Sequence, residues 1–131
     1  MIIGSLLDGQ YGAMMGGLAG IIGHNWPIYY QFKGGKGVAS SVAVMLYVFP
    51  VYGVIALLFF FLLVALTRYI SLGSIAMLTL FAALVIIFNW GSWLVCAWAI
   101  AIAALCIFRH RANIGRLLKG TENKLAMKSK K

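Results

Sequence analysis

Acidic side chains are scarce in this sequence, and long stretches of it carry no charge at all. Only two of the 131 residues are Asp or Glu, against 11 Lys and Arg, and none of these four types occurs at 9–32, 37–67 or 69–108. The composition, 63% hydrophobic and 10% charged, lies outside the usual range of soluble domains. Uncharged apolar stretches of this length are typical of membrane spans. The sequence therefore predicts an integral membrane protein.

The shortage of carboxylates and cysteines excludes several kinds of site. Asp8 and Glu122 lie near opposite ends of the sequence, so no neighbouring pair of carboxylates is available for acid–base chemistry or Mg²⁺ binding. Cys96 and Cys106 fall in one apolar run without a nearby His or acidic residue. This pattern predicts packing residues rather than a disulfide framework or a metal site. We predict no metal and no other cofactor.

Five apolar segments predict the transmembrane helices. They are residues 11–23, 38–49, 51–66, 71–88 and 92–108. The first two are short for a hydrocarbon core of ~30 Å at ~1.5 Å per residue, so we expect them to be tilted, broken or shielded. The predicted fold class is all-α, a polytopic membrane helix bundle. We expect a membrane-embedded domain over residues 1–120 and a basic cytoplasmic tail over residues 121–131.

Basic residues are confined to three places: the segment 33–36, Arg68, and the segment 109–131. If each break between helices reverses the chain, all three emerge on one side of the membrane. Lys and Arg are retained in cytoplasmic segments, so we predict that this side, with the C-terminus, is cytoplasmic. A basic patch is also the electrostatic footprint of nucleic-acid binding, but topology accounts for this charge and we predict no nucleic-acid partner.

Glycines recur along the first apolar segment. Gly12, Gly16 and Gly20 are spaced by four residues, which places small residues along one helix face. Such a face permits close helix–helix approach in lipid. The alternative is that these glycines are simply common in membrane helices.

The run KGGKG interrupts the apolar sequence between the first two segments. Its residues are Lys33, Gly34, Gly35, Lys36 and Gly37. A glycine-rich backbone can aim several N–H groups at one point, and ammonium groups add charge, so the run predicts a phosphate-binding site. It is not the loop of a P-loop nucleotide triphosphatase, because Tyr30 stands at the position of that loop's first Gly. The alternative is that both lysines are snorkelling cations at a helix end.

Two further pairs of polar residues lie on the same predicted face. His110 and Asn113 are three residues apart, so on a helix they share a face and could reach one ligand. Ser71 and Ser74 also share a face, although serines at a helix start are commonly caps. The neighbouring cations can be read as topology anchors: Arg109, Arg111, Arg116 and Lys119.

Three motifs follow one another along the chain. They read HNWP with FKGGKGVA, then RYISLGSI, then RHRANIGRLLKGTE, at residues 24–27 with 32–39, 68–75 and 109–122. Together they resemble the bacterial PlsY family of acyl-phosphate:glycerol-3-phosphate acyltransferases, over about residues 18–125. The resemblance implies a seven-helix bundle in the inner membrane, of which this chain would supply about five transmembrane helices. It also implies transfer of an acyl group from acyl phosphate to the sn-1 hydroxyl of glycerol 3-phosphate, giving lysophosphatidic acid for phospholipid synthesis.

The resemblance also implies roles for particular residues. The implied catalytic residues are Lys36, Ser74, His110 and Asn113. Weaker candidates for substrate binding are His24, Arg68, Ser71 and Glu122. Lys36 and the glycines beside it would hold phosphate, while the other three catalytic candidates would contact glycerol 3-phosphate or the reacting groups. No nucleophilic residue or metal is implied, since acyl phosphate is already activated, and catalysis would rest on positioning and electrostatic stabilisation.

The sequence departs from the family at its start. Family members begin with two further helices joined by a loop of Gly-Ser-Gly-Asn type, and no such loop occurs before Gly23. The chain therefore looks N-terminally truncated, and we expect little activity unless another polypeptide supplies the missing helices. One alternative is a small membrane transporter or channel subunit with an anion-recognising cytoplasmic face, for which polar residues at mid-membrane depth are expected. Another is a non-catalytic remnant.

Overall fold

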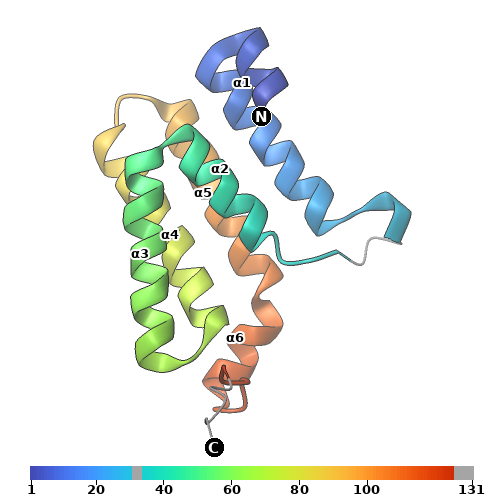
Figure 1. The fold of residues 1–131 in the computed structure, drawn as a ribbon, viewed down its shortest axis with the longest axis vertical. Coiled ribbons are helices and arrows are strands. Elements are labelled where there is room, and N and C mark those ends of the chain that lie inside the picture. Colours follow the sequence, from blue (N-terminus) through green and yellow to red (C-terminus); the bar gives the residue numbers. More distant parts are fainter. Residues whose placement is uncertain (31–33, 126–131) are drawn as a thin grey trace, which may run out of the picture.

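The computed structural model describes residues 1–30 and 34–125, and every regular element in these ranges is helical (Figure 1). The elements are α1 (Ile2–Asn25), the short 3₁₀ helix η1 (Ile28–Tyr30), α2 (Val38–Val48), α3 (Pro50–Thr67), α4 (Ile70–Phe88), α5 (Trp93–Arg109) and α6 (Arg111–Leu118). The predicted all-α fold class is confirmed. The predicted apolar segments correspond to α1–α5, with α1 beginning well before residue 11.

Two helices are long and apolar enough to cross a membrane by themselves. Among the described residues these are α3 and α4, each with a mean hydropathy of 2.5. Helices α5 and α6 form a third candidate span with a bend of 60° between them. Helix α2 has 11 residues, roughly 16 Å of helix, which agrees with the expectation that the early segments are short.

Helix α1 is broken near its start. Asp8 and Gly9 have non-helical backbone angles, and Gly9 has a φ of 52°, a value that favours glycine. The turns before the break fold back along the rest of the helix (Figure 1). The Gly4 backbone then lies so close to Gly12 that a Cβ on either residue would collide with the other's carbonyl group.

The predicted glycine face therefore permits close packing, although not along its whole length. Gly12 and Gly16 face the folded-back start of α1, where a Cβ on Gly16 would lie 3.1 Å from the Met1 nitrogen. Gly17, which lies beside this face, packs against α2, where its Cβ would lie 2.8 Å from Val44 Cγ1. Gly20 has no atom within 4 Å of its would-be Cβ. Close approach at the first two predicted positions is confirmed, and at Gly20 it is absent.

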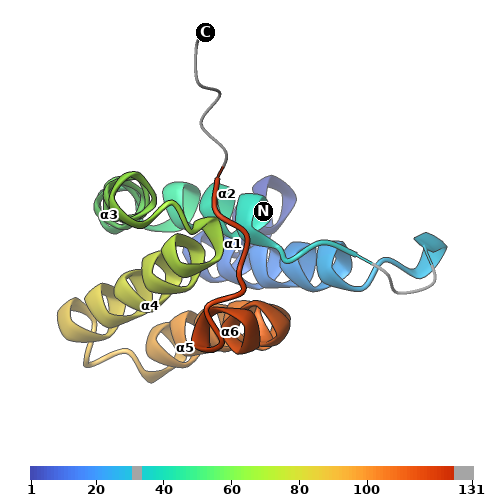
Figure 2. The same cartoon turned by 90° about the horizontal axis from the view of Figure 1, so that it is seen from below.

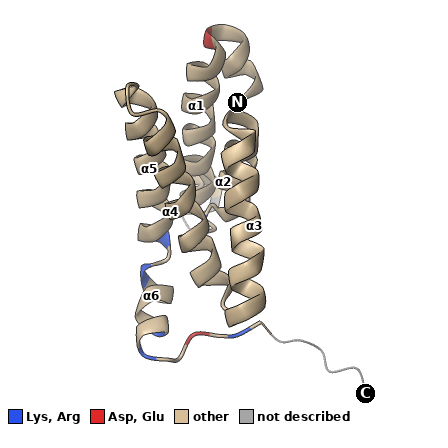
Figure 3. Ribbon diagram, turned by 90° about the vertical axis from the view of Figure 1, so that its left-hand side faces the viewer, with Lys and Arg blue, Asp and Glu red and all other residues tan. Residues whose placement is uncertain are grey.

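The breaks between helices reverse the chain, as predicted. Pro50 lies in the first turn of α3, where its missing N–H has no intrahelical partner to lose. Arg68 adopts a left-handed conformation with a φ of 64° and ends α3. Consequently the end of α1, the start of α2, the α3–α4 turn and α6 lie toward one end of the bundle (Figure 1). This end carries the Lys and Arg residues coloured blue in Figure 3, whereas the acidic part of α1, coloured red, lies at the other end.

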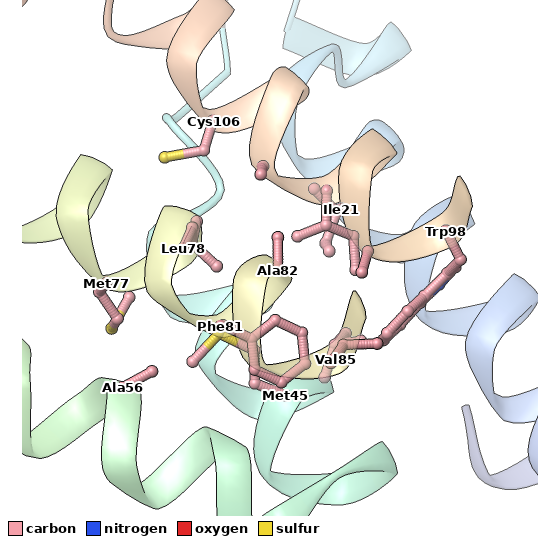
Figure 4. Packing of buried hydrophobic residues seen from close by; sticks show 14 of the residues in the cluster. Ile21, Met45, Ala56, Met77, Leu78, Phe81, Ala82, Val85, Trp98 and Cys106 are labelled. Atoms are coloured by element: carbon pink, nitrogen blue, oxygen red, sulfur yellow. The ribbon is translucent and has the colours of Figure 1, made fainter. Parts of the chain in front are cut away.

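The core lies around α4, which packs between α3 and α5. Of the residues in the apolar span of α4, 44% are buried inside the protein, compared with 11% of those in α3. Helix α3 therefore turns most of its surface outward. Phe81 and Val85 of α4 are fully buried with Met45 of α2 (Figure 4). The indole N–H of Trp98 donates to the Met14 carbonyl at 2.8 Å, which ties α5 to α1.

The segment after α6 returns across the polar end of the bundle. Residues 120–125, called the strap below, contain no helix, and the Leu125 N–H donates to the Arg68 carbonyl at 2.8 Å. Seen from below, the strap crosses the end of the bundle (Figure 2). The first residues of the predicted basic tail therefore pack on the membrane domain, and residues 126–131 lie outside the described part of the chain.

Candidate functional site

The predicted phosphate residues lie between α1 and α2. Gly34, Gly35, Lys36 and Gly37, called the glycine loop below, are described by the structure, whereas the predicted Lys33 lies outside the described residues. Gly37 has a φ of 71° and directly precedes α2. Glycine adopts this left-handed conformation without steric cost, so the loop can turn sharply into the helix.

Close packing against the end of α1 accounts for the other loop glycines. A Cβ on Gly35 would lie 2.5 Å from His24 Nε2, and one on Gly34 would collide with the His24 and Asn25 carbonyl oxygens. A larger side chain at Gly34 would push the loop away from α1, whereas one at Gly35 would displace the His24 ring. His24 therefore supports the loop, and among the described residues it is not one that lines the cavity beside it.

A cavity of ≈ 320 Å³ opens at this end of the bundle. The described residues that line it are Lys36, Val38, Ile70, Ser71, Ser74, His110, Asn113, Glu122 and Asn123. They come from the glycine loop, α2, α4, the bend between α5 and α6, α6 itself and the strap. The structure thus gathers all four predicted catalytic residues, together with two of the weaker candidates, around one space.

Glu122 of the strap is held by three donors. Its Oε1 accepts hydrogen bonds from Ser71 Oγ at 2.7 Å and from the Asn113 amide, and its Oε2 pairs with Arg116 Nε at 2.7 Å. The hydrogen bond from Asn113, followed by those from Ser71 and Arg116, lowers the pKa of Glu122 from 4.5 to about 2. The strap is therefore fixed to α4 and α6 by a carboxylate that stays ionised at neutral pH.

His110 is buried at the bend between α5 and α6. Its Nδ1 lies 2.8 Å from the Cys106 carbonyl, and because a carbonyl oxygen only accepts, Nδ1 carries a proton. In the neutral ring Nε2 is then left as an acceptor. Ser74 Oγ donates to the Ile70 carbonyl in its own helix at 2.9 Å, which leaves the hydroxyl oxygen able to accept. The cavity therefore offers both acceptors and the Lys36 cation.

Two of the cations predicted as topology anchors make specific contacts within the bundle. Arg116 pairs with Glu122, and the guanidinium of Arg109 donates to the carbonyls of Gly34 and Gly35. Arg111 instead donates to the Phe108 carbonyl three residues earlier. The anchor interpretation is therefore incomplete for Arg109 and Arg116.

The remaining candidates divide as follows. Arg68 does not line the cavity among the described residues; its N–H donates to the Val64 carbonyl, and its own carbonyl accepts from the Leu125 N–H of the strap. Asn25 was not predicted, yet its side chain is fully buried and neither amide atom has a hydrogen-bond partner in the described structure. The sequence signal that could have marked Asn25 is its position as a polar residue directly before Trp26-Pro27 and close to the glycine loop.

Among the described residues no group of three or more His, Cys, Asp and Glu side chains comes together to hold a metal ion.

An apolar helix bundle whose basic and buried polar residues meet at one end is the architecture of an integral membrane protein with a surface site. Residues 1–120 match the family model for glycerol-3-phosphate acyltransferase, and the chain belongs to that family. A glycerol-3-phosphate acyltransferase of a Thermoanaerobacter species is 46% identical over 129 residues, which cover 98% of this chain and 65% of that protein. The chain thus spans about two thirds of the length of this relative.

Solved structures show the same fold. The crystal structure of PlsY, an integral membrane glycerol 3-phosphate acyltransferase, in its glycerol 3-phosphate form has a TM-score of 0.87 and 34% identity, covering 95% of this chain and 62% of that one. Its lysophosphatidic acid form has the same score and identity and covers 95% and 64%. The predicted family and membrane bundle are confirmed.

Proposed function

We propose that this chain forms the greater part of an enzyme that transfers an acyl group from acyl phosphate to glycerol 3-phosphate. The sn-1 hydroxyl oxygen attacks the acyl carbonyl carbon, the bond from that carbon to the phosphate oxygen breaks, and the hydroxyl proton leaves with inorganic phosphate. Lysophosphatidic acid is the other product. The observation that carries the proposal is the cavity that gathers Lys36, Ser74, His110 and Asn113.

The lining residues suit this chemistry. Lys36 supplies a positive charge toward phosphate oxygens, and a charge-assisted contact is stronger than a neutral one. The glycine loop supplies backbone N–H groups beside it. Ser74 and His110 offer acceptors for substrate hydroxyls, and the Asn113 amide adds a donor. Catalysis then depends on placing the hydroxyl against the activated carbonyl and on stabilising the departing phosphate.

The position of the polar groups favours the acyltransferase over a transporter. The buried polar side chains of the described residues are Asn25, Ser41, Ser71, Ser74, His110 and Asn113. All of them lie at or near the helix ends that meet at the basic end of the bundle. A transporter is expected to carry its binding groups near mid-membrane depth. Under the positive-inside rule, we place this basic end and the C-terminus on the cytoplasmic side of a bacterial inner membrane.

Further helices complete the proposed enzyme. The relatives are longer than this chain, which covers 65% of one and 62% of a solved structure. We infer that a second glycine-rich loop, on helices from the same or another polypeptide, closes the phosphate site. These 131 residues alone should insert in a membrane and show little acyl transfer, because an open half-site positions substrates poorly.

The test measures acyl transfer by the purified chain in lipid nanodiscs. Acyl phosphate and glycerol 3-phosphate are supplied, and lysophosphatidic acid is quantified for the chain alone and for the chain co-expressed with the first two helices of a relative. Turnover is expected only in the second sample, and Lys36→Ala should abolish most of it while Lys119→Ala leaves it unchanged. Absence of turnover in both samples contradicts the proposed activity, and robust turnover by the chain alone contradicts the need for a second loop.

A further inference from the structure

Arg109 ends α5 with its side chain spread over the glycine loop. Its Nη2 donates to the Gly34 carbonyl at 2.9 Å and to the Gly35 carbonyl at 2.7 Å, and its Nε donates to the Gly35 carbonyl at 3.1 Å. The guanidinium carbon also lies 5.2 Å from the centre of the Trp26 ring, which is within the range of a cation–π contact. One side chain thus joins the end of α1, the glycine loop and the end of α5.

These contacts hold a backbone that has little else to order it. Among the described residues, no backbone–backbone hydrogen bond outside the helices involves Gly34, Gly35 or Lys36. Glycine loses more conformational entropy on ordering than any other residue, and hydrogen bonds from a charged donor are stronger than neutral ones. Arg109 is therefore the group best placed to select this conformation of the loop.

Because peptide bonds are planar, the two carbonyl contacts also set the direction of the neighbouring N–H groups. None of the described peptide bonds is cis, and in a trans peptide the N–H points opposite to the C=O. Because the carbonyls of Gly34 and Gly35 point at Arg109, the N–H groups of Gly35 and Lys36 point away from it. The guanidinium thereby fixes the direction of two consecutive donors in the loop.

Each end of this contact adjoins a residue of the cavity. Gly35 directly precedes Lys36, Arg109 directly precedes His110, and both Lys36 and His110 line the cavity. We propose that Arg109 is a positioning residue that fixes Lys36 relative to His110 by holding the two loop carbonyls. Arg109 itself does not line the cavity among the described residues. The proposal rests on the proposed function only for the identity of the ligand.

The first test follows the loop itself and requires no activity. Backbone ¹⁵N order parameters of residues 34–37 are measured in nanodiscs for the full chain and for Arg109→Ala, Arg109→Lys and Arg111→Ala. Both Arg109 variants should lower these order parameters from about 0.85 toward roughly 0.6, since Lys keeps the charge but lacks the fork that spans two carbonyls. Arg111 is the matched control because it donates within its own segment and lies 4.5 Å from the Phe108 ring centre. Unchanged order parameters in Arg109→Ala, or wild-type order parameters in Arg109→Lys, overturn the proposal.

The second test asks whether Arg109 acts through Lys36. The acyl-transfer assay is run with the chain co-expressed with the first two helices of a relative. Arg109→Ala should raise, by roughly tenfold, the KM of the same substrate whose KM is raised by Lys36→Ala. In the Lys36→Ala background its effect should largely vanish, because interacting positions are not additive. Fully additive effects overturn the proposal. A wild-type complex without turnover contradicts the proposed function, while the order-parameter measurement still decides whether Arg109 holds the loop.

Discussion

Glu122 is an acidic residue held by side chains from two helices. It is one of only two acidic residues in the chain, and its pKa is lowered to about 2 by the donors Asn113, Ser71 and Arg116. A carboxylate with a depressed pKa contributes stability above its unfolded pKa, which is about 4.5 for Glu122, and this stability is lost as the pH falls through the folded pKa. The strap contact should therefore weaken between about pH 4.5 and pH 2.

We predict that the melting temperature of the protein in detergent falls across this pH range. Glu122→Gln, which keeps the shape of the side chain but cannot ionise, should start at a lower melting temperature and fall much less on acidification. Differential scanning fluorimetry at matched ionic strength measures both curves. Asp8 is the remaining acidic side chain, so Asp8→Asn serves as the control and should keep the wild-type fall. Parallel curves for the wild type and Glu122→Gln would show that the strap carboxylate is not the group that titrates.

At the scale of elements, the start of α2 depends on a single backbone conformation. Gly37 has a φ of 71° and a would-be Cβ 2.6 Å from Asn25 Oδ1. A left-handed conformation costs a residue other than glycine roughly 1–2 kcal/mol, and the clash with Asn25 adds to this. Helix α2 has no side-chain cap that could compensate.

We predict that Gly37→Ala destabilises the protein by at least about 1 kcal/mol and displaces the glycine loop. The control is Gly20→Ala in α1, where a Cβ meets no atom within 4 Å and the better helix propensity of Ala should be neutral or stabilising by up to about 1 kcal/mol. Thermal melting in nanodiscs compares the two variants. Equal stability of Gly37→Ala and the wild type would contradict the left-handed start of α2.

The sequence predicted the elements better where charge or breakers marked them. Pro50, Arg68 and the segment 89–92 end or begin helices within a residue or two of the predicted positions, because each interrupts an apolar run that membrane burial otherwise favours. The sequence did not predict that α1 folds back on itself at Asp8 and Gly9, because this fold-back depends on contact between the Gly4 and Gly12 backbones. Helix α6 was missed as a separate element because its eight residues form only part of the last basic segment.

The same reasoning explains what was predicted of the site. Lys36, Ser74, His110 and Asn113 carry reactive or polar groups in recognisable motifs, so their side chains marked them before their proximity was known. Arg109 acts on backbone carbonyls, which leave no trace in the residue types of the loop. The contacts of Glu122 depend on the strap folding back over α4, and no periodicity in the strap predicts that path.

At the scale of the whole molecule, the basic segments meet at one end, and a labelling experiment tests their orientation. In a cysteine-free background, we predict that Arg68→Cys and Lys119→Cys react with a membrane-impermeant maleimide only after permeabilisation of the cells. Gly91→Cys, in the turn between α4 and α5 at the opposite end, should react in intact cells. Labelling of Arg68→Cys or Lys119→Cys from outside would reverse the proposed topology.

The shortness of α2 has a consequence for how a lipid-borne donor is reached. Helices α2 and α3 meet at Phe49, but α2 has 11 residues and α3 has 18, so the start of α2 falls roughly 10 Å short of the far end of α3 along the bundle. Figure 1 shows the start of α2 well above the lower end of α3. The glycine loop is thus set back along the bundle from the α3–α4 turn. If the proposed donor is a long-chain acyl phosphate, its carbonyl can reach the loop while its methylenes stay among the lipid tails, which avoids about 0.8 kcal/mol for each methylene drawn into water. In the proposed reaction the short helix therefore lets the water-soluble acceptor reach the donor, so that the donor need not be extracted from the bilayer.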